Sequence, residues 1–459
     1  MLFVMRATTH FHYYRSIVEA AVRRGHKVEV LFERFGESWS AENYLEPIEE
    51  SRRENGNFSH GQALNRKGWL KNVIGWSRRL LNYNHNLNFK DQPKYFRDRS
   101  VAMFPSYWKI LFKNSLARFF FRKRTVGRFF RYVESKTSPE PSVVAHIKKI
   151  SPEVVIASAG NLNADSADIE YIKAAKSLGV HTVIPVISWD FLTTKGTIHI
   201  LPDRLLVWNK FHESEALKYH HFPEKNMRII GAPVFDKWLS EIGKTPELDR
   251  DSFAKKYGLR SEDPFVLYLG STANVAADES WVVQEMRKAL DESGDEALKK
   301  TQIIVRPHPA HWKIYGSIKN LKDVRIVPEI GGMMPDNKSA LELFYDSVYH
   351  SVAIAGINTS GMIDAIIAGK PCIAMLIERY RSRHEKTAYF QQLLKSDAAN
   401  LARDGRGFAR EFKKLLSGND EHKKEREAFI KDAIRPRGFE ISAGEAAIVE
   451  VENLLHEKN

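Results

Sequence analysis

Short apolar runs alternate with stretches of helical periodicity along most of the chain. The first run begins at Leu2 and is followed by a polar, histidine-containing loop, after which residues 16–24 carry apolar side chains at the spacing of one helix face. The runs that read as strands lie at residues 2–5, 28–32, 154–157, 181–186, 204–208, 227–230, 265–269, 302–305, 352–355 and 371–375. Strands separated by helical stretches predict an α/β fold, in which helices cover both faces of parallel sheets.

Two Rossmann-like lobes are predicted, with a boundary near residue 240. Between Asp236 and Pro264 the chain turns polar and helical before a fresh strand begins. The expected parts are a first lobe, a second lobe and a terminal amphipathic helix, at residues 1–240, 241–440 and 441–459.

Composition places the chain among globular proteins. Hydrophobic residues make up 43% and charged residues 28%, a balance that allows full-sized cores. Cys372 is the single cysteine, which excludes an internal disulfide and a cysteine-based zinc cluster and fits a reducing compartment, so a cytoplasmic protein is expected. No uncharged apolar run of about 18 residues is present, so no membrane-spanning helix is expected.

The basic charge is concentrated in the N-terminal part. Residues 1–136 hold 26 Lys and Arg against 12 Asp and Glu, a formal +14, which leaves −1 for residues 137–459. Within this part, residues 35–135 are rich in aromatic and basic side chains and show few strand signals, which predicts a basic helical insertion in the first lobe. A positive electrostatic field concentrated on the first lobe favours an anionic partner, such as lipid headgroups, nucleic acid or a phosphorylated substrate.

The most basic stretch of this insertion is residues 108–131, which contain eight basic and no acidic residues interleaved with aromatics. This pattern predicts a helix lying on an anionic membrane surface. The alternative is a helix whose aromatic stripe is lobe core and whose cations are solvated. No recognised nucleic-acid-binding motif accompanies the charge, so a nucleic-acid partner is not expected.

Chemistry is expected in the loops that follow the strands, because ligands of open α/β sheets bind there. The most informative loop contains Asn358, Thr359 and Ser360 ahead of a helix. These side chains can cap the helix and the flanking glycines permit close backbone approach, which favours an anion site suited to a diphosphate. Asp364, one turn on, could accept hydrogen bonds from ribose hydroxyls. The alternative is an ordinary capped helix with an exposed aspartate.

A second loop holds Arg306 and His308 at the end of an apolar strand. Prolines on both sides of His308 restrict its backbone, which reduces the entropy that its side chain loses on binding. The guanidinium of Arg306 can donate two hydrogen bonds to phosphate oxygens, and the imidazole of His308 can donate a hydrogen bond to a phosphate or a leaving group. A third loop, with Gly270 and Ser271 after a strand, allows a ligand to approach the backbone but is a common turn sequence.

The first lobe supplies candidates for acid–base chemistry. His10 and His12 follow the first strand, and either could act as general base on an acceptor hydroxyl because an imidazole titrates near neutral pH. Spacing does not decide between them, since residues two apart can point to opposite sides. Asp190, at the end of a later strand, is the preferred polar anchor for sugar hydroxyls, although aspartate is also an ordinary turn former.

These stretches resemble the GT-B superfamily of glycosyltransferases, and within it the bacterial surface-polysaccharide and CDP-glycerol glycerophosphotransferase-like branch. The resemblance covers most of the chain outside the insertion. It is carried by Arg306-Pro307-His308-Pro309, by Asn358-Thr359-Ser360 with Asp364 and Gly369-Lys370-Pro371, and by Trp208-Asn209 with the segment Ile230 to Asp236.

The resemblance implies two lobes facing across a cleft, with a nucleotide-activated donor on the second lobe and the acceptor on the first. On this basis the diphosphate would meet Ser360 and His308, Asp364 would reach the ribose, and the base would lie near Pro328. His10 or His12 would be the general base. No convincing Asp-X-Asp motif is present, so no metal and no cofactor besides the donor are expected, with helix ends and cations neutralising the donor charge.

The function expected from these features is metal-independent transfer of a sugar from a nucleotide-sugar donor to a cell-surface glycan or glycolipid, at the inner face of the membrane. Three alternatives remain open. They are transfer of a CDP-linked polyol phosphate, 2-epimerisation of a nucleotide sugar, and a non-catalytic glycan-binding scaffold.

Overall fold

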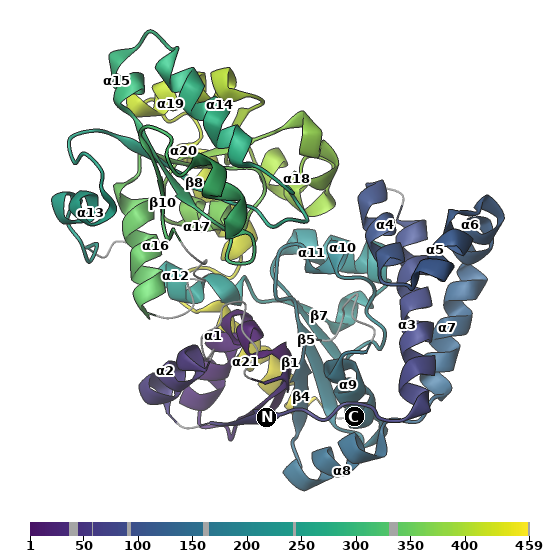
Figure 1. The fold of residues 1–459 in the computed structure, drawn as a ribbon. Coiled ribbons are helices and arrows are strands. Elements are labelled where there is room, and N and C mark those ends of the chain that lie inside the picture. Colours follow the sequence, from purple (N-terminus) through teal and green to yellow (C-terminus); the bar gives the residue numbers. More distant parts are fainter. Residues whose placement is uncertain are drawn as a thin grey trace. The chain divides into compact units, whose positions relative to one another are not determined.

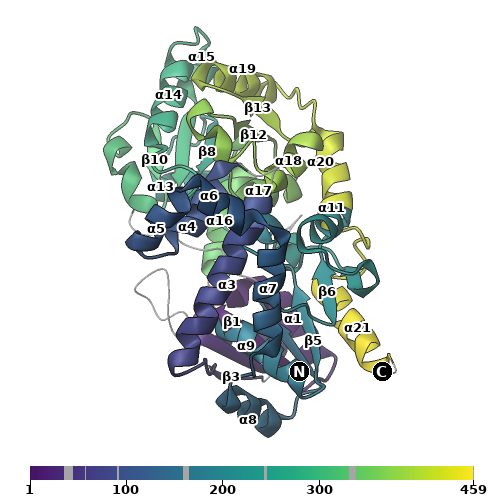
Figure 2. The same ribbon diagram turned by 90° about the vertical axis from the view of Figure 1, so that its right-hand side faces the viewer.

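The protein forms two compact units, each built around one parallel sheet. The computed structural model describes residues 1–35, 45–56, 58–89, 93–158, 165–241, 245–329 and 338–457. The chain leaves the first unit after Asp236 and returns to it at Ala433, so that the second unit spans Lys237 to Asp432. Figures 1 and 2 show the elements of both units.

The return of the chain to the first unit begins earlier than the sequence pattern indicates. Residues 433–440, which the pattern assigns to the second lobe, belong to the first unit. The carbonyl oxygen of Ala433 accepts a hydrogen bond from Asn209 Nδ2 at 2.8 Å, and that of Ile434 accepts one from the Ala232 N–H at 3.1 Å. The backbone of this segment is therefore paired with the first unit before the terminal helix starts.

The sheet of the first unit has seven parallel strands in the order β3-β2-β1-β4-β5-β6-β7. They are β1 (Leu2–Ala7), β2 (Glu29–Arg34), β3 (Ser59–Gln62), β4 (Val154–Ala157), β5 (His181–Pro185), β6 (Arg204–Val207) and β7 (Met227–Ile229). The strand order reverses between β1 and β4, which is the switch point where loops of such sheets diverge and ligands bind.

The helices that accompany this sheet come from both ends of the chain. They are α1 (Phe11–Arg23), α8 (Pro141–Ile150), α9 (Ala167–Ser177), α10 (Phe191–Thr194), α11 (Lys210–Glu215) and the terminal α21 (Ala443–His456), while α12 (Asp236–Glu241) begins at the boundary of the units. The α21 helix packs against α1, and α9 packs against β1, β4 and β5.

Among the described residues of the insertion, the regular elements are helices apart from the short edge strand β3. Its helices are α2 (Glu46–Asn55), α3 (Trp69–Asn88), α4 (Lys94–Ala102), α5 (Ser106–Lys113), α6 (Ser115–Arg122) and α7 (Arg124–Lys136). Figures 1 and 2 show α3 and α7 side by side, with α4, α5 and α6 at one end of the pair.

The single helix predicted over residues 108–131 is wrong, because this stretch is divided among α5, α6 and α7. The backbone is extended at Asn114 and again at Lys123. Asn114 ends the first segment and starts the next, since its Oδ1 accepts from the Leu116 N–H at 2.8 Å. These two breaks allow Phe112 and Phe121, on different helices, to meet with ring centroids 5.5 Å apart.

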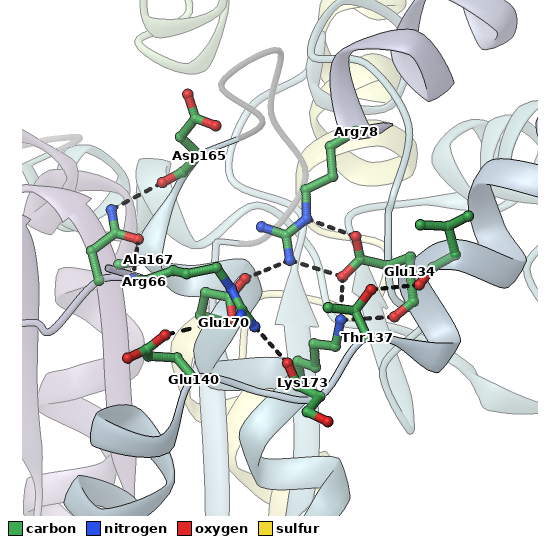
Figure 3. A network of polar contacts seen from close by, with 12 residues as sticks. Arg66, Arg78, Glu134, Thr137, Glu140, Asp165, Ala167, Glu170 and Lys173 are labelled. Atoms are coloured by element: carbon green, nitrogen blue, oxygen red, sulfur yellow. Dashed lines mark hydrogen bonds and ion pairs between the residues drawn. The ribbon is translucent and has the colours of Figure 1, made fainter. Parts of the chain in front are cut away.

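A buried network of charges joins the insertion to the sheet-covering helix α9 (Figure 3). Arg78 of α3 donates to both Glu134 oxygens at 2.8 Å and to Glu170 of α9 at 2.6 Å. Lys173 donates to Glu134 at 2.9 Å, and Arg66 donates to Glu170 at 2.7 Å. All five side chains are almost fully excluded from solvent. The middle of α3 and the C-terminal end of α7 are therefore fixed to α9.

The sheet of the second unit has six parallel strands in the order β10-β9-β8-β11-β12-β13. They are β8 (Phe265–Leu269), β9 (Gln302–Arg306), β10 (Val324–Ile326), β11 (Ala353–Gly356), β12 (Cys372–Met375) and β13 (Asn400–Ala402). Here the order reverses between β8 and β11, so the loops that follow these two strands flank the switch point.

Helices surround this second sheet as well. They are α13 (Arg250–Tyr257), α14 (Ser280–Asp291), α15 (Glu296–Lys300), α16 (Lys338–His350), α17 (Gly361–Ile367), α18 (Ala388–Lys395), α19 (Gly405–Leu416) and α20 (Lys423–Phe429). One continuous core links the strands to α14 and α19, with members such as Tyr268, Val305, Met286 and Phe412 fully buried.

The α/β fold with two parallel sheets is confirmed. Each of the ten runs predicted as strands forms one. The described residues form three further strands, β3, β10 and β13, which have only three or four residues each and were not predicted.

Candidate functional site

Three strand-end loops of the second unit converge at the switch point. The Gly270 N–H donates to the carbonyl oxygen of Arg306 at 2.9 Å, which joins the loop after β8 to the end of β9. A Cβ atom at Gly270 would lie 3.0 Å from the backbone nitrogen of His308, and one at Gly356 would lie 2.9 Å from the carbonyl oxygen of Leu269. Glycine is required for this close approach. The structure thus brings the Gly270, His308 and Ser360 loops together.

The loop after β8 is held from behind by Glu279, a residue that the sequence analysis missed. Glu279 is fully buried before α14, and its carboxylate accepts from the Ser271 N–H, from Tyr268 Oη at 3.0 Å and from Tyr315 Oη at 2.9 Å. Burial raises the pKa of Glu279 to about 7 in spite of these donors. An acidic residue at the start of a helix gives no sequence signal that it points inward.

Glu279 should make the stability of the second unit depend on pH. The pKa of Glu279 is about 7 in the folded protein, above its usual value of 4.5. Between these two pH values the carboxyl is protonated in the folded protein and ionised in the unfolded chain. Stability should therefore fall by up to about 3 kcal/mol as pH rises from about 4.5 to about 7. In Glu279→Gln, Oε1 can still accept from Ser271 and Tyr315, and Nε2 can donate to Tyr268, so this dependence should be largely absent.

Guanidinium denaturation at about pH 5 and about pH 8 measures this effect. Asp364 adds a slope of the same sign, because its pKa is also raised, to about 7. The matched control is Glu285→Gln, an exposed position on the same helix, which should retain the wild-type profile. A Glu279→Gln profile as steep as that of wild type would contradict the assignment.

Arg306 is the last residue of β9 and Asp364 lies in the first turn of α17, near enough for the charge of each to affect the pKa of the other. The Arg306 guanidinium is buried and lies 4.6 Å from the centre of the Phe344 ring. Burial lowers its pKa to about 10. Burial raises the pKa of Asp364 to about 7, and the charge of Arg306 opposes this rise only in part. The site therefore holds a buried cation beside a carboxyl whose pKa is raised close to neutral pH.

His308 is neutral and oriented as a donor. Burial, assisted by His311, lowers its pKa to about 4. Its Nδ1 accepts from the Ala310 N–H at 3.1 Å, which places the proton of the neutral ring on Nε2. The side chain can thus donate one hydrogen bond without carrying charge.

The polar loop ahead of α17 divides into supporting and exposed side chains. Asn358 is buried, and its Nδ2 donates to the Arg383 carbonyl at 3.0 Å and to Tyr389 Oη at 2.7 Å. Thr359 Oγ1 accepts from the Gly361 N–H at 3.4 Å. Ser360 is exposed and its side chain makes no cap to the helix. Direct ligand contact by these three residues stays a prediction, and Ser360 is the one whose side chain is open to solvent.

The predicted base-binding position, Pro328, lies just past β10 and is half-buried. Residues 330–337, which follow it, lie outside the described residues. The assignment of Pro328 therefore stays a prediction.

In the first unit, His10 follows β1 at the other switch point. Burial, together with the nearby cations Arg6, Lys195 and Arg34, lowers its pKa to about 3. Its Nδ1 is buried and makes no hydrogen bond within the described part of the chain. His10 is thus a neutral imidazole. His12, on α1, meets the edge of Tyr13 with ring centroids 5.2 Å apart.

Lys195, one of the cations that lower the pKa of His10, also pairs with Asp190: its Nζ lies 3.4 Å from the Asp190 carboxylate. Ser188 and Thr194 each donate to Asp190 at 2.6 Å. Burial alone would raise its pKa, but Lys195 and these two donors lower it overall. Asp190 is therefore an ionised carboxylate that organises its own turn. Among the residues that the structure describes, no cluster of three or more His, Cys, Asp or Glu side chains could hold a metal ion.

Solved structures with the same fold match this chain over nearly its whole length. A glycosyltransferase from Rickettsia africae superposes with a TM-score of 0.55 at 11% identity, over 100% of this chain and 99% of that one. The UDP-GlcNAc 2-epimerase of Neisseria meningitidis, bound to UDP-GlcNAc, gives 0.55 at 10% identity, over 99% of each chain. The enzyme of that name from Methanocaldococcus jannaschii, in complex with UDP-GlcNAc and UDP, gives 0.54 at 12% identity, over 99% of each chain.

The chain has the GT-B fold. At these identities the likeness to GT-B enzymes establishes the fold alone. No family model matches the chain. A curated protein, one component of the aspartyl/glutamyl-tRNA(Asn/Gln) amidotransferase of Caldicellulosiruptor saccharolyticus, is 29% identical over 112 residues, which is 21% of this chain and 23% of that protein. The chain thus spans about a quarter of the length of this relative, too little to indicate a shared activity.

Proposed function

We propose that this GT-B protein is an enzyme acting on a nucleotide sugar, and that the switch point of its second unit binds the nucleotide diphosphate. The observation that supports this most is the convergence of the Gly270, His308 and Ser360 loops around the buried cation Arg306. Two of the solved structures with this fold hold UDP-GlcNAc. A uridine diphosphate sugar is therefore the first ligand to test.

In this proposal each side chain has a role that its environment suits. Arg306 neutralises diphosphate charge in a site of low dielectric, where such an interaction is strong. His308 donates from Nε2 to a phosphate oxygen, and Ser360 adds its exposed hydroxyl. Asp364 receives the ribose hydroxyls, and the base lies near Pro328. Stabilising the departing diphosphate in this way serves any reaction that breaks the bond between sugar and nucleotide.

The first candidate reaction is 2-epimerisation of the sugar. The likeness to two UDP-GlcNAc 2-epimerases over the whole chain favours it. The reaction requires no acceptor, and it requires a base that removes the proton at C2. His10 lies at the strand end where such a base is expected and is unprotonated, but its pKa of about 3 makes it a weaker base than the near-neutral imidazole expected from the sequence.

The second candidate is sugar transfer to a glycan or lipid-linked acceptor, at the inner face of the membrane and without a metal ion. Two observations favour it: the likeness to a glycosyltransferase, and an exposed basic and aromatic surface on the first unit that suits an acceptor embedded in lipid. His10 or His12 would then deprotonate the acceptor hydroxyl. Preference for CDP over UDP would indicate instead the transfer of a polyol phosphate.

Thermal denaturation with UDP, CDP, GDP, CMP and dTDP compounds tests the binding proposal. A ligand specific for the folded state stabilises it by about 2.7 kcal/mol at a hundredfold excess over its dissociation constant. Replacing Arg306 by Gln should weaken UDP binding by roughly 10- to 100-fold, because a hydrogen bond to a charged group contributes about 1.5–3 kcal/mol. His308→Gln, at a less buried position, should weaken it by about 10-fold.

Arg325→Gln is the matched control, since Arg325 is an exposed arginine on the neighbouring strand β10. It should leave nucleotide affinity unchanged. If no nucleotide raises the unfolding temperature of the wild-type protein, the enzyme proposal fails and a scaffold role gains support.

The two reactions differ in what happens at C2 of the sugar. Epimerisation by proton removal breaks the C2–H bond, so a sugar recovered after reaction in D2O carries deuterium at C2. Transfer leaves C2 untouched and releases UDP only when an acceptor is present. Nuclear magnetic resonance of UDP-GlcNAc incubated with the enzyme distinguishes them.

A further inference from the structure

The tip of the insertion carries both buried and exposed apolar side chains. We call residues 106–132 the basic tip. One set of its aromatic residues faces inward, where Phe112 joins Tyr83 and Phe104 in a small core that also contacts Trp108 and Phe121. The aromatic content of this stretch is therefore only partly used for packing within the described structure.

The other set faces outward. Leu116 is 78% exposed, Ile110 is 72% exposed and Phe119 is 67% exposed. The other exposed large apolar residues of the basic tip are Tyr107, Leu111, Phe120, Phe129 and Tyr132. Single exposed apolar residues are ordinary, but a concentration of this size on three successive short helices marks an interaction surface.

The charges around these side chains have one sign. Five exposed cations lie among them: Lys113, Arg122, Lys123, Arg124 and Arg128. The sequence from Arg99 to Val133 contains no Asp or Glu. Lys123 Nζ lies 5.3 Å from the centre of the exposed Phe119 ring, so apolar and cationic groups share the same surface.

We propose that the basic tip binds the surface of an anionic lipid bilayer, with Ile110, Leu116 and Phe119 inserted among the acyl chains and the cations contacting headgroup phosphates. Exposed aliphatic and aromatic side chains interspersed with exposed cations match the interface of such a membrane. A nucleic-acid partner would account for the cations and the aromatic rings but not for the exposed aliphatic side chains of Leu116 and Ile110.

The basic tip is also firmly attached to the rest of the first unit. The α7 helix continues from the tip to Glu134, where the buried network of Arg78, Glu134, Glu170 and Lys173 joins it to α3 and α9 (Figure 3). None of the helices within the described residues is both long and apolar enough to cross a bilayer. Attachment by the tip would hold the first unit in a fixed orientation at the membrane, and this holds whatever reaction the enzyme performs.

Flotation of the full-length protein with lipid vesicles tests the proposal. We expect binding to phosphatidylcholine vesicles containing about one third phosphatidylglycerol, and little binding to pure phosphatidylcholine. The variant Arg122→Gln/Lys123→Gln/Arg124→Gln should bind roughly 100-fold more weakly, at about 1 kcal/mol for each cation near the surface. Ile110→Ser/Leu116→Ser/Phe119→Ser should lose binding even at low salt, because it removes the inserted groups.

Two control variants separate the tip from general effects. Lys300→Gln/Lys319→Gln/Lys322→Gln removes the same net charge from exposed positions of the second unit and should bind like wild type. Phe439→Ser removes an exposed aromatic residue, 63% accessible, from elsewhere in the first unit. All variants should keep the wild-type unfolding temperature, which excludes misfolding as the cause of lost binding.

Three results would overturn the proposal. The first is failure of the wild-type protein to float with the anionic vesicles. The second is equal loss of binding in the charge-matched control. The third is a wild-type oligomer that the Ile110→Ser/Leu116→Ser/Phe119→Ser variant converts to a monomer without any vesicle binding by either, since the tip would then be an interface between copies of this chain.

Discussion

Replacing Arg78 by methionine should lower the free energy of unfolding of the first unit by about 3–5 kcal/mol. Arg78 is 3% exposed and donates to Glu134 and Glu170, which are themselves buried. Although burial would raise the pKa of Glu134, Arg78 and then Lys173 lower it to about 2, so this carboxylate is ionised in the folded protein. Methionine fills a similar volume but leaves two buried carboxylates with too little positive charge.

The neighbouring position provides the control. Arg79 pairs with Asp165, but both side chains are partly exposed, so the ion pair contributes little. Arg79→Met should cost less than about 1 kcal/mol. Guanidinium denaturation of both variants, with hydrogen exchange to identify the unit that unfolds, measures the difference. Equal stability losses in the two variants would show that burial of the network is not the deciding factor.

The fold was largely predictable because each central strand is buried on both faces and therefore reads as a continuous apolar run. The three strands that were missed, β3, β10 and β13, all lie at an edge of their sheet. Edge strands pair on one side only, and β3, with the sequence Ser-His-Gly-Gln, has no apolar pattern at all. Their pairing depends on the neighbouring strand, which local sequence does not reveal.

The candidate site was predictable to the level of loops. Ligand-binding loops of parallel sheets gather at the carboxyl ends of the strands, and the loops of Gly270, His308 and Ser360 do meet there. The roles of single side chains within those loops depend on tertiary partners instead. Asn358 turns its amide toward Tyr389, thirty-one positions further along the chain, and Glu279 becomes a buried acceptor only because Tyr268 and Tyr315 face it.

The basic tip shows the same division. Composition correctly indicated a cationic and aromatic surface, but the same pattern of basic and aromatic residues predicted one helix over 108–131. Asn114 breaks it through a local cap, and the packing of Phe112 against Phe121 makes the break favourable. Which aromatic residues face inward is decided by Tyr83 of α3, a contact that no local pattern encodes.

Replacing Gly444 by alanine should destabilise the first unit by at least about 2–3 kcal/mol. Gly444 lies in the first turn of α21, where the helix contacts α1, and a Cβ atom there would lie 2.1 Å from Ser16 Oγ and 2.4 Å from the Ser16 carbonyl oxygen. The two helices cannot separate easily, because the Asp236 carboxylate accepts from the Gly444 N–H at 2.8 Å and also from Ser16 Oγ.

The expected sign is informative because helix propensity predicts the opposite. Alanine is favoured over glycine by about 0.8–1 kcal/mol within a helix, so a gain in stability from Gly444→Ala would mean that α21 does not pack closely on α1. Asn453→Ala, at an exposed position of the same helix, improves propensity without a steric cost and should be neutral or slightly stabilising. Denaturation of both variants decides between the two effects, and a loss confined to Gly444→Ala would establish that the C-terminal helix is an integral part of the first unit.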